Sequence, residues 1–205
     1  MILCLVTDRR RRPIVEQCRD AVRAGVDLVQ LRESDLEAAA LADLARSLVR
    51  LTHETATRLV LNDRLDVALA CGAHGVHLRR DSIPPDRARS IAPAGFLIGC
   101  SVRGVDEAVQ AAPHADYLIA GTIFPTGSKP GLREHLGVEG LAAIVGAVTI
   151  PVLGIGGVSM DRIAAVARAG AGGIAAIGFF DSNGDTLVAT AREARLRFDS
   201  VNPAS

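Results

Sequence analysis

Short β-rich runs alternate with helical stretches along the whole chain, and this alternation restricts the fold more than any other feature. The eight β-rich runs occupy residues 2–7, 27–32, 58–62, 75–78, 96–101, 117–121, 151–157 and 173–178. Between them, apolar residues recur at steps of three and four, the period of a helix, as at Leu41, Leu44, Leu48 and Leu51. Strict alternation of strand and helix predicts a parallel sheet joined by right-handed crossovers.

An internal repeat supports this alternation. The segments AVRAGVDLVQL, LACGAHGVHL and VARAGAGGIAAI share one layout, in which an Ala-rich helix end reaches a glycine two residues before a buried strand. The glycines are Gly25, Gly72 and Gly170. Glycine at this place is typical of the left-handed residue that ends a helix, so each segment is predicted to be a helix that leads into the next strand.

Eight such units predict a closed parallel sheet, a (β/α)₈ TIM barrel of nearly minimal size, with residues 1–205 forming a single domain. The low aromatic content of 3% and the many small branched residues suit parallel strands covered by helices. An open doubly wound sheet is the main alternative. No GxGxxG motif follows the first strand, which ends in Thr7 and Asp8, and this argues against the alternative.

Charge and apolar pattern exclude several classes of function. Acidic and basic residues balance at 23 each, so we expect no nucleic-acid partner, and we interpret the RRRR run at residues 9–12 as a solvated loop. No apolar run approaches the roughly 20 residues of a membrane span, and the first residues lack the basic start of a signal peptide. Four scattered cysteines without metal-ligand spacing indicate free thiols in a cytoplasmic protein.

Polar side chains stand at or just past the predicted ends of strands two to five, where a barrel places its reactive groups. They are Gln30, Arg32, Asn62, Asp63, His77, Arg79, Asp81 and Ser101. Asp63 and Asp81 are candidate ligands for a Mg²⁺ ion that bridges them to a diphosphate, and N-capping of a helix is the alternative role of Asp63. His77 is a candidate general base, and a buried, hydrogen-bonded histidine is the alternative.

Glycines follow the seventh and eighth strands, in GIGG at 154–157 and IGFF at 177–180. In barrels these two loops often present backbone N–H groups to a phosphate, and glycine lets the backbone approach an anion closely. Tight turns that need positive φ are the alternative explanation. We expect a phosphate to bind at Gly156, Gly157, Ile177 and Gly178.

The connection at residues 122–136 is long for a strand-to-helix loop, and such loops are often functional. It contains Lys129, the only lysine of the chain, together with Thr126 and Ser128. Two hydroxyls and an ammonium within four residues suit phosphate oxygens, and a lysine offers a movable point charge that the planar fork of arginine does not replace everywhere. We expect all three residues to bind substrate, with Lys129 taking part in catalysis.

Over nearly its whole length the sequence resembles the thiamine phosphate synthase/TenI superfamily. The matching stretches are LVTD, QLRE, LNDRLDVAL, GVHL, SVRGVDEA, ADYLIAGTIFPTGSKPG, PVLGIGG and AGAGGIAA. The resemblance implies a (β/α)₈ barrel that binds a phosphorylated thiazole and, in the synthase branch, a pyrimidine diphosphate with Mg²⁺.

Several positions depart from the family pattern. The lysine of the family's QLREK is Ser34 here, and the second Mg²⁺ aspartate aligns with Ser82, with Asp81 where the family often has Glu. A family serine near position 178 is Gly178 here. These changes weaken the diphosphate half of the site more than the thiazole-phosphate half, and Arg79 or Arg80 is a candidate to compensate for the lost charge.

We therefore favour a TenI-like thiazole tautomerase, an isomerase that needs no cofactor. Tautomerisation needs an acid or base, and the histidine of the tautomerase pattern is Thr122 here, so Thr122, His77 or a bound water would have to move the proton. The alternative is a thiamine phosphate synthase, for which the resemblance matches Asn62, Asp63 and the loop with Lys129. A third hypothesis is a non-catalytic binder of thiazole or thiamine phosphate, and a homodimer is left open.

Overall fold

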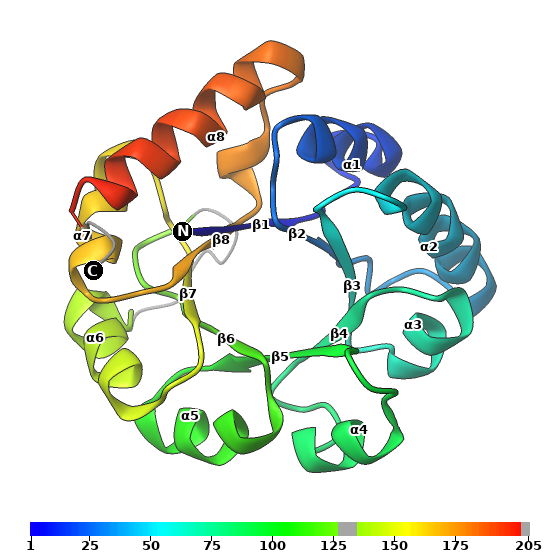
Figure 1. Cartoon of the computed structure of the whole chain (residues 1–205), viewed down its shortest axis with the longest axis horizontal. Coiled ribbons are helices and arrows are strands. Elements are labelled where there is room, and N and C mark those ends of the chain that lie inside the picture. Colours follow the sequence, from blue (N-terminus) through cyan, green and yellow to red (C-terminus); the bar gives the residue numbers. More distant parts are fainter. Residues whose placement is uncertain (127–134, 202–205) are drawn as a thin grey trace.

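The computed structural model describes residues 1–126 and 135–201. Eight parallel strands form a closed barrel with helices around its outside (Figure 1). The strands are β1 (Ile2–Val6), β2 (Leu28–Leu31), β3 (Arg58–Asn62), β4 (Gly75–Leu78), β5 (Leu97–Val102), β6 (Tyr117–Gly121), β7 (Val152–Ile155) and β8 (Gly173–Ala176). The α-helices are α1 (Ile14–Arg23), α2 (Ala38–Thr52), α3 (Leu65–Cys71), α4 (Pro85–Ile91), α5 (Val105–Ala111), α6 (Gly137–Ala147), α7 (Ile163–Arg168) and α8 (Gly184–Asp199).

Pairing of the first strand with the last closes the sheet. Ile2 lies opposite Gly173, and the register continues in parallel to Leu5 and Ala176. The helix ring closes at the same seam, because α8 contacts both α7 and α1. The predicted TIM barrel is therefore confirmed, and the open doubly wound alternative is wrong.

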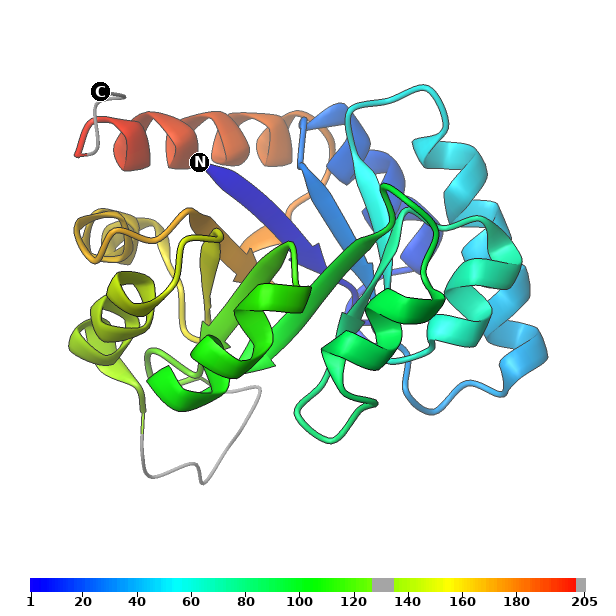
Figure 2. The same ribbon diagram turned by 60° about the horizontal axis from the view of Figure 1, so that its bottom comes forward.

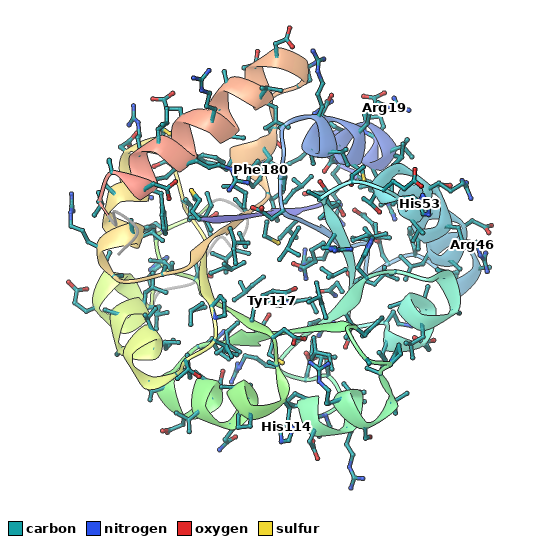
Figure 3. The ribbon with its side chains drawn as sticks, in the orientation of Figure 1. Arg19, Arg46, His53, His114, Tyr117 and Phe180 are labelled. Atoms are coloured by element: carbon teal, nitrogen blue, oxygen red, sulfur yellow. The ribbon has the colours of Figure 1, made fainter. Side chains whose placement is uncertain are left out.

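Successive strand residues face two different apolar layers. Along β1, Leu3 and Leu5 belong to the layer between barrel and helices, whereas Cys4 and Val6 belong to the layer inside the barrel. Tyr117 lies in the inner layer, and Figure 3 shows it within the ring of strands. The inner layer is packed with side chains, so functional groups must stand above it, at an end of the barrel.

The repeated glycines have the predicted left-handed conformation. Gly25, Gly72 and Gly170 have φ angles of 67°, 68° and 78°, and each follows a helix that leads into the next strand. A residue with a side chain would lose about 1–2 kcal/mol in this conformation. The repeat seen in the sequence is thus a repeat of helix ends.

Several predicted strand boundaries differ from the structure by one or two residues, and the region around β7 shows the reason most clearly. β7 ends at Ile155 rather than at residue 157, because Gly156 and Gly157 turn into positive φ. A 3₁₀ turn, Met160–Arg162, precedes α7. Figure 2 shows the strand arrowheads, which mark the carboxyl ends, directed to one edge of the barrel.

All four cysteines are buried free thiols, and burial raises the pKa of the Cys4 thiol to about 12. In the described part of the chain, no helix combines the length and the apolar character needed to cross a membrane.

Candidate active site

A cavity of about 1170 Å³ opens at the carboxyl ends of the strands. The predicted site residues that line it are Gln30, Arg32, Asn62, His77, Asp81, Ser101, Thr122, Thr126, Gly156, Gly157, Ile177 and Gly178. Asp63 lines a smaller neighbouring cavity of about 90 Å³, which Asn62 and Arg79 also border. Ser128 and Lys129 lie outside the described residues. The barrel rule therefore brings most of the predicted residues to one place.

Buried polar side chains form the floor of the large cavity. His77, only 2% exposed, places Nε2 2.8 Å from Ser101 Oγ and Nδ1 3.3 Å from Tyr117 Oη. Beside this chain, Gln30 Nε2 donates to Asn62 Oδ1 over 3.1 Å. These contacts fix the orientation of Gln30, Asn62 and Ser101 toward whatever occupies the cavity.

Complete burial makes His77 a weak base. Desolvation lowers the pKa of its imidazole to about 3, so the ring is neutral at physiological pH. Both ring nitrogens already have partners. This geometry suits the buried, hydrogen-bonded histidine that was the alternative for His77, and it positions Ser101.

Charged side chains at the ends of β3 and β4 pair with one another. Arg79 pairs with Asp81 and also lies 3.8 Å, Nη1 to Oδ2, from Asp63. The other oxygen of Asp63 accepts a hydrogen bond from Ser82 Oγ, and Ser82 Oγ in turn accepts from the backbone N–H of Arg79 over 2.7 Å. One guanidinium thus bridges the two candidate Mg²⁺ carboxylates.

The capping role considered for Asp63 is wrong. The residue before α3 is Arg64, and no side chain caps that helix. Asp63 itself has a φ of 67°, which a residue other than glycine adopts at a cost of about 1–3 kcal/mol. Such strain is common at functional sites, and here it accompanies a carboxylate that faces Ser82 and Arg79.

The polar residues described at the ends of β3 and β4 suit a hard divalent cation. Asp63 and Asp81 supply carboxylate oxygens and Ser82 a hydroxyl, and such hard donors suit Mg²⁺, which one or two carboxylates and substrate phosphates usually hold. Among the described residues, no group of three or more His, Cys, Asp or Glu side chains forms a cage. The donor set therefore fits an ion bound jointly with a diphosphate.

At the ends of β7 and β8 the cavity wall is mostly backbone. Gly156 has a φ of 100° and Gly157 a φ of 63°, and a Cβ at Gly157 would lie 2.8 Å from Phe124 Cβ. A Cβ at Gly156 would collide with Thr122. The positive-φ turns were the alternative to phosphate binding, and the structure shows both a turn and direct exposure of this backbone to the cavity.

Among the described residues, three arginines that line the cavity were not predicted there: Arg10, Arg11 and Arg103. Arg79 and Arg80, which were candidates to compensate for the lost charge, line it as well. The RRRR run was interpreted as a solvated loop, and residues 9–11 do form an exposed turn, but Arg10 and Arg11 also border the cavity. Its position directly after the first strand is the signal that places it at the carboxyl end of the barrel.

Comparisons with known proteins identify the family. The family model described as thiamine monophosphate synthase matches residues 3–180. The chain is 42% identical to a thiamine-phosphate synthase of Methanoregula boonei over 91% of this chain and 86% of that protein. It is 41% identical to the thiamine-phosphate synthase of Moorella thermoacetica over 88% and 87%.

A solved structure agrees. The thiamine phosphate pyrophosphorylase from Pyrococcus furiosus superposes with a TM-score of 0.85 at 36% identity, over 98% of this chain and 96% of that one. The tautomerase interpretation is contradicted, since these relatives carry the name of the synthase. This chain belongs to the thiamine monophosphate synthase family.

Proposed function

We propose that this protein joins hydroxymethylpyrimidine diphosphate to thiazole phosphate, giving thiamine phosphate and diphosphate. The observation that carries the proposal is the similarity at about 40% identity, over most of both chains, to proteins named thiamine-phosphate synthase. Those names are the names of an enzyme, which favours the synthase over a non-catalytic binder.

The chemistry supports the same conclusion. The bond between the pyrimidine methylene carbon and the diphosphate oxygen breaks, and the electron pair leaves with the diphosphate. The thiazole nitrogen then donates its lone pair to the resulting carbocation, forming the new C–N bond. Neither step removes a proton, so the reaction does not need the base that Thr122 and a neutral His77 supply poorly.

The reaction needs cationic groups beside the diphosphate, which leaves with additional negative charge. Arg32, Arg79, Arg80 and Arg103 border the cavity, and preorganised cations at a developing charge are among the strongest catalytic devices. We assign them to the diphosphate, together with Thr126 and, from the sequence alone, Ser128 and Lys129. These arginines compensate for the positive charge that is lost where Ser34 takes the place of the family lysine.

We assign Mg²⁺ to the oxygens of Asp63, Asp81 and Ser82. An ion bound there with substrate would neutralise part of the negative charge of the diphosphate. Arg79 pairs with both carboxylates, so it is placed to exchange one of them for a diphosphate oxygen. We assign the thiazole phosphate to Gly156, Gly157, Ile177 and Gly178, and the rings of the substrates to Gln30, Asn62 and Ser101.

The test is a product assay with the purified chain and both substrates, with Mg²⁺ and with a chelator. We expect thiamine phosphate and diphosphate in equal amounts with Mg²⁺ and a large loss with the chelator. Calorimetry with thiazole phosphate alone runs in parallel. Binding without product under either condition would support the non-catalytic binder and reject the synthase.

A further inference from the structure

The four arginines of residues 9–12 have different roles. At one end, Arg9 Nη2 pairs with Asp35 Oδ2 at 2.7 Å. At the other end, Arg12 pairs with Asp20 at 2.6 Å and donates to the carbonyl of Ser182 over 3.1 Å. These contacts hold the loop after β1 at both ends, against the loops that follow β2 and β8.

Between the two anchors, Arg11 reaches the end of β8. A Cβ built on Gly178 would lie 3.3 Å from Arg11 Nη1, 3.5 Å from Nη2 and 3.6 Å from Cζ. The guanidinium therefore lies directly over the place where a side chain at 178 would stand. Gly178 does not have a left-handed φ, so its backbone does not require glycine, and the consequence of the missing side chain is room for Arg11.

Arg11 keeps part of its side chain accessible although it pairs with two carboxylates. Nη1 pairs with Asp181, and Nε lies 4.0 Å from Asp8 Oδ2, while the side chain stays 42% exposed. Arg11 lines the cavity that Gly156, Gly157 and Gly178 also line.

We propose that Arg11 binds the phosphate group of the thiazole substrate, against the backbone of Gly178. Arginine presents several N–H donors in a planar fork that matches phosphate oxygens, and charge-assisted bonds of this kind are about twice as strong as neutral ones. Arg11 thus supplies from the β1 loop the donor that a serine near 178 would supply in the family pattern. The inference rests on the proposed function, because it names a further residue for the same substrate.

The test compares binding of two ligands by calorimetry, thiazole phosphate and the thiazole alcohol that lacks the phosphate. Arg11→Met should weaken binding of thiazole phosphate about tenfold or more and leave binding of the alcohol unchanged. Arg9→Met is the matched control from the same run, since its side chain pairs with Asp35 and does not line the cavity. It should leave both dissociation constants within about twofold.

A second variant separates phosphate binding from a merely structural ion pair. Asp181→Asn removes the partner of Arg11 but keeps the guanidinium, so binding of thiazole phosphate should stay equal or tighten. If Asp181→Asn weakens binding as Arg11→Met does, or if Arg11→Met weakens both ligands equally, the inference is wrong. Arg11→Lys, which keeps the charge without the fork, should fall between wild type and Arg11→Met. Failure of the proposed function is a different result, namely no thiamine phosphate from the wild-type chain.

Discussion

Two halves of one barrel mouth bind anions by different means in the proposed site. At the ends of β3 and β4 the wall is made of side chains, with Arg79 between the carboxylates of Asp63 and Asp81. At the ends of β7 and β8 it is made of backbone, brought into the cavity by Gly156 and Gly157. The first half departs from the family pattern at Ser34 and Ser82, whereas the second departs from it at Gly178 and keeps its glycine turn.

The difference teaches how each half tolerates change. A side-chain donor can be lost and regained from a neighbouring loop, because a long arginine reaches the same point from several positions, as proposed above for Arg11. The glycine turn itself has no such freedom, since its shape depends on φ angles and on close contacts such as that of Gly157 with Phe124. The predictions below test the two halves separately.

The largest effect is expected from Asp63→Asn, which removes the carboxylate charge but keeps an oxygen that can accept from Ser82. We expect kcat/KM for synthesis to fall about a hundredfold with Mg²⁺, and binding of thiazole phosphate alone to stay unchanged. The control is Asp66→Asn, in the first turn of α3, whose carboxylate pairs with Arg64 and lines neither cavity. Mg²⁺-dependent turnover at the wild-type rate in Asp63→Asn would remove this residue from the metal site.

A smaller loss is expected from Lys129→Ala, a prediction that rests on the sequence. Its ammonium is assigned to the leaving diphosphate, so kcat should fall roughly tenfold or more. Lys129→Arg keeps the charge and should recover part of the rate. Single-turnover measurements with both substrates check this, and an unchanged rate for Lys129→Ala would show that the arginines alone carry the charge.

The backbone half is tested by Gly157→Ala, whose Cβ would collide with the Pro125 carbonyl and approach Phe124 Cβ to 2.8 Å. We expect a several-fold rise in KM for thiazole phosphate and a loss of stability beyond the cost of a left-handed alanine, about 1–2 kcal/mol. Gly25→Ala is the matched control, because its φ of 67° is similar and a Cβ there meets nothing within 4 Å. Urea unfolding of both variants measures the difference, and equal losses would show that Gly157 is needed for its φ alone.

The fold was predictable because its signals are local. Helical periodicity and the glycines at helix ends depend on residues close in the sequence, and eight such units leave few topologies. The same rule placed Gln30, Asn62 and Ser101 at the cavity. Boundaries were less accurate, as at β7, where Gly156 looks like a strand residue until its φ is known.

The charge arrangement was not predictable, because it depends on contacts between loops far apart in the chain. Nothing in the sequence places Arg11 over Gly178 or Arg79 between two aspartates. The tautomerase interpretation gave too much weight to the charges lost at Ser34 and Ser82. It considered compensation by Arg79 or Arg80, but not by Arg103, which the closed barrel brings to the same cavity.

The smallest effect at neutral pH is expected from His77→Gln, which keeps groups able to hydrogen-bond Ser101. Because the proposed reaction removes no proton, kcat at pH 7.5 should stay within a few-fold of wild type. The buried ring also gives a stability signature. Burial lowers the pKa of His77 to about 3, whereas the unfolded chain protonates histidine near 6.5. As pH falls below 6.5, the unfolded state takes up a proton that the folded state refuses, so the free energy of unfolding decreases.

The slope is at most about 1.4 kcal/mol per pH unit, and the contribution is fully present above pH 6.5. Urea unfolding at pH 7.5 and 5.5 should therefore show a smaller loss of stability in His77→Gln than in wild type, since carboxylates titrate equally in both. His53→Gln, whose side chain is 72% exposed on the outer surface, should keep the wild-type slope (Figure 3). A kcat that collapses in His77→Gln, together with the loss of a break that the wild-type pH profile shows, would make His77 a proton-transfer group. The two halves of the mouth would then no longer suffice to explain the reaction.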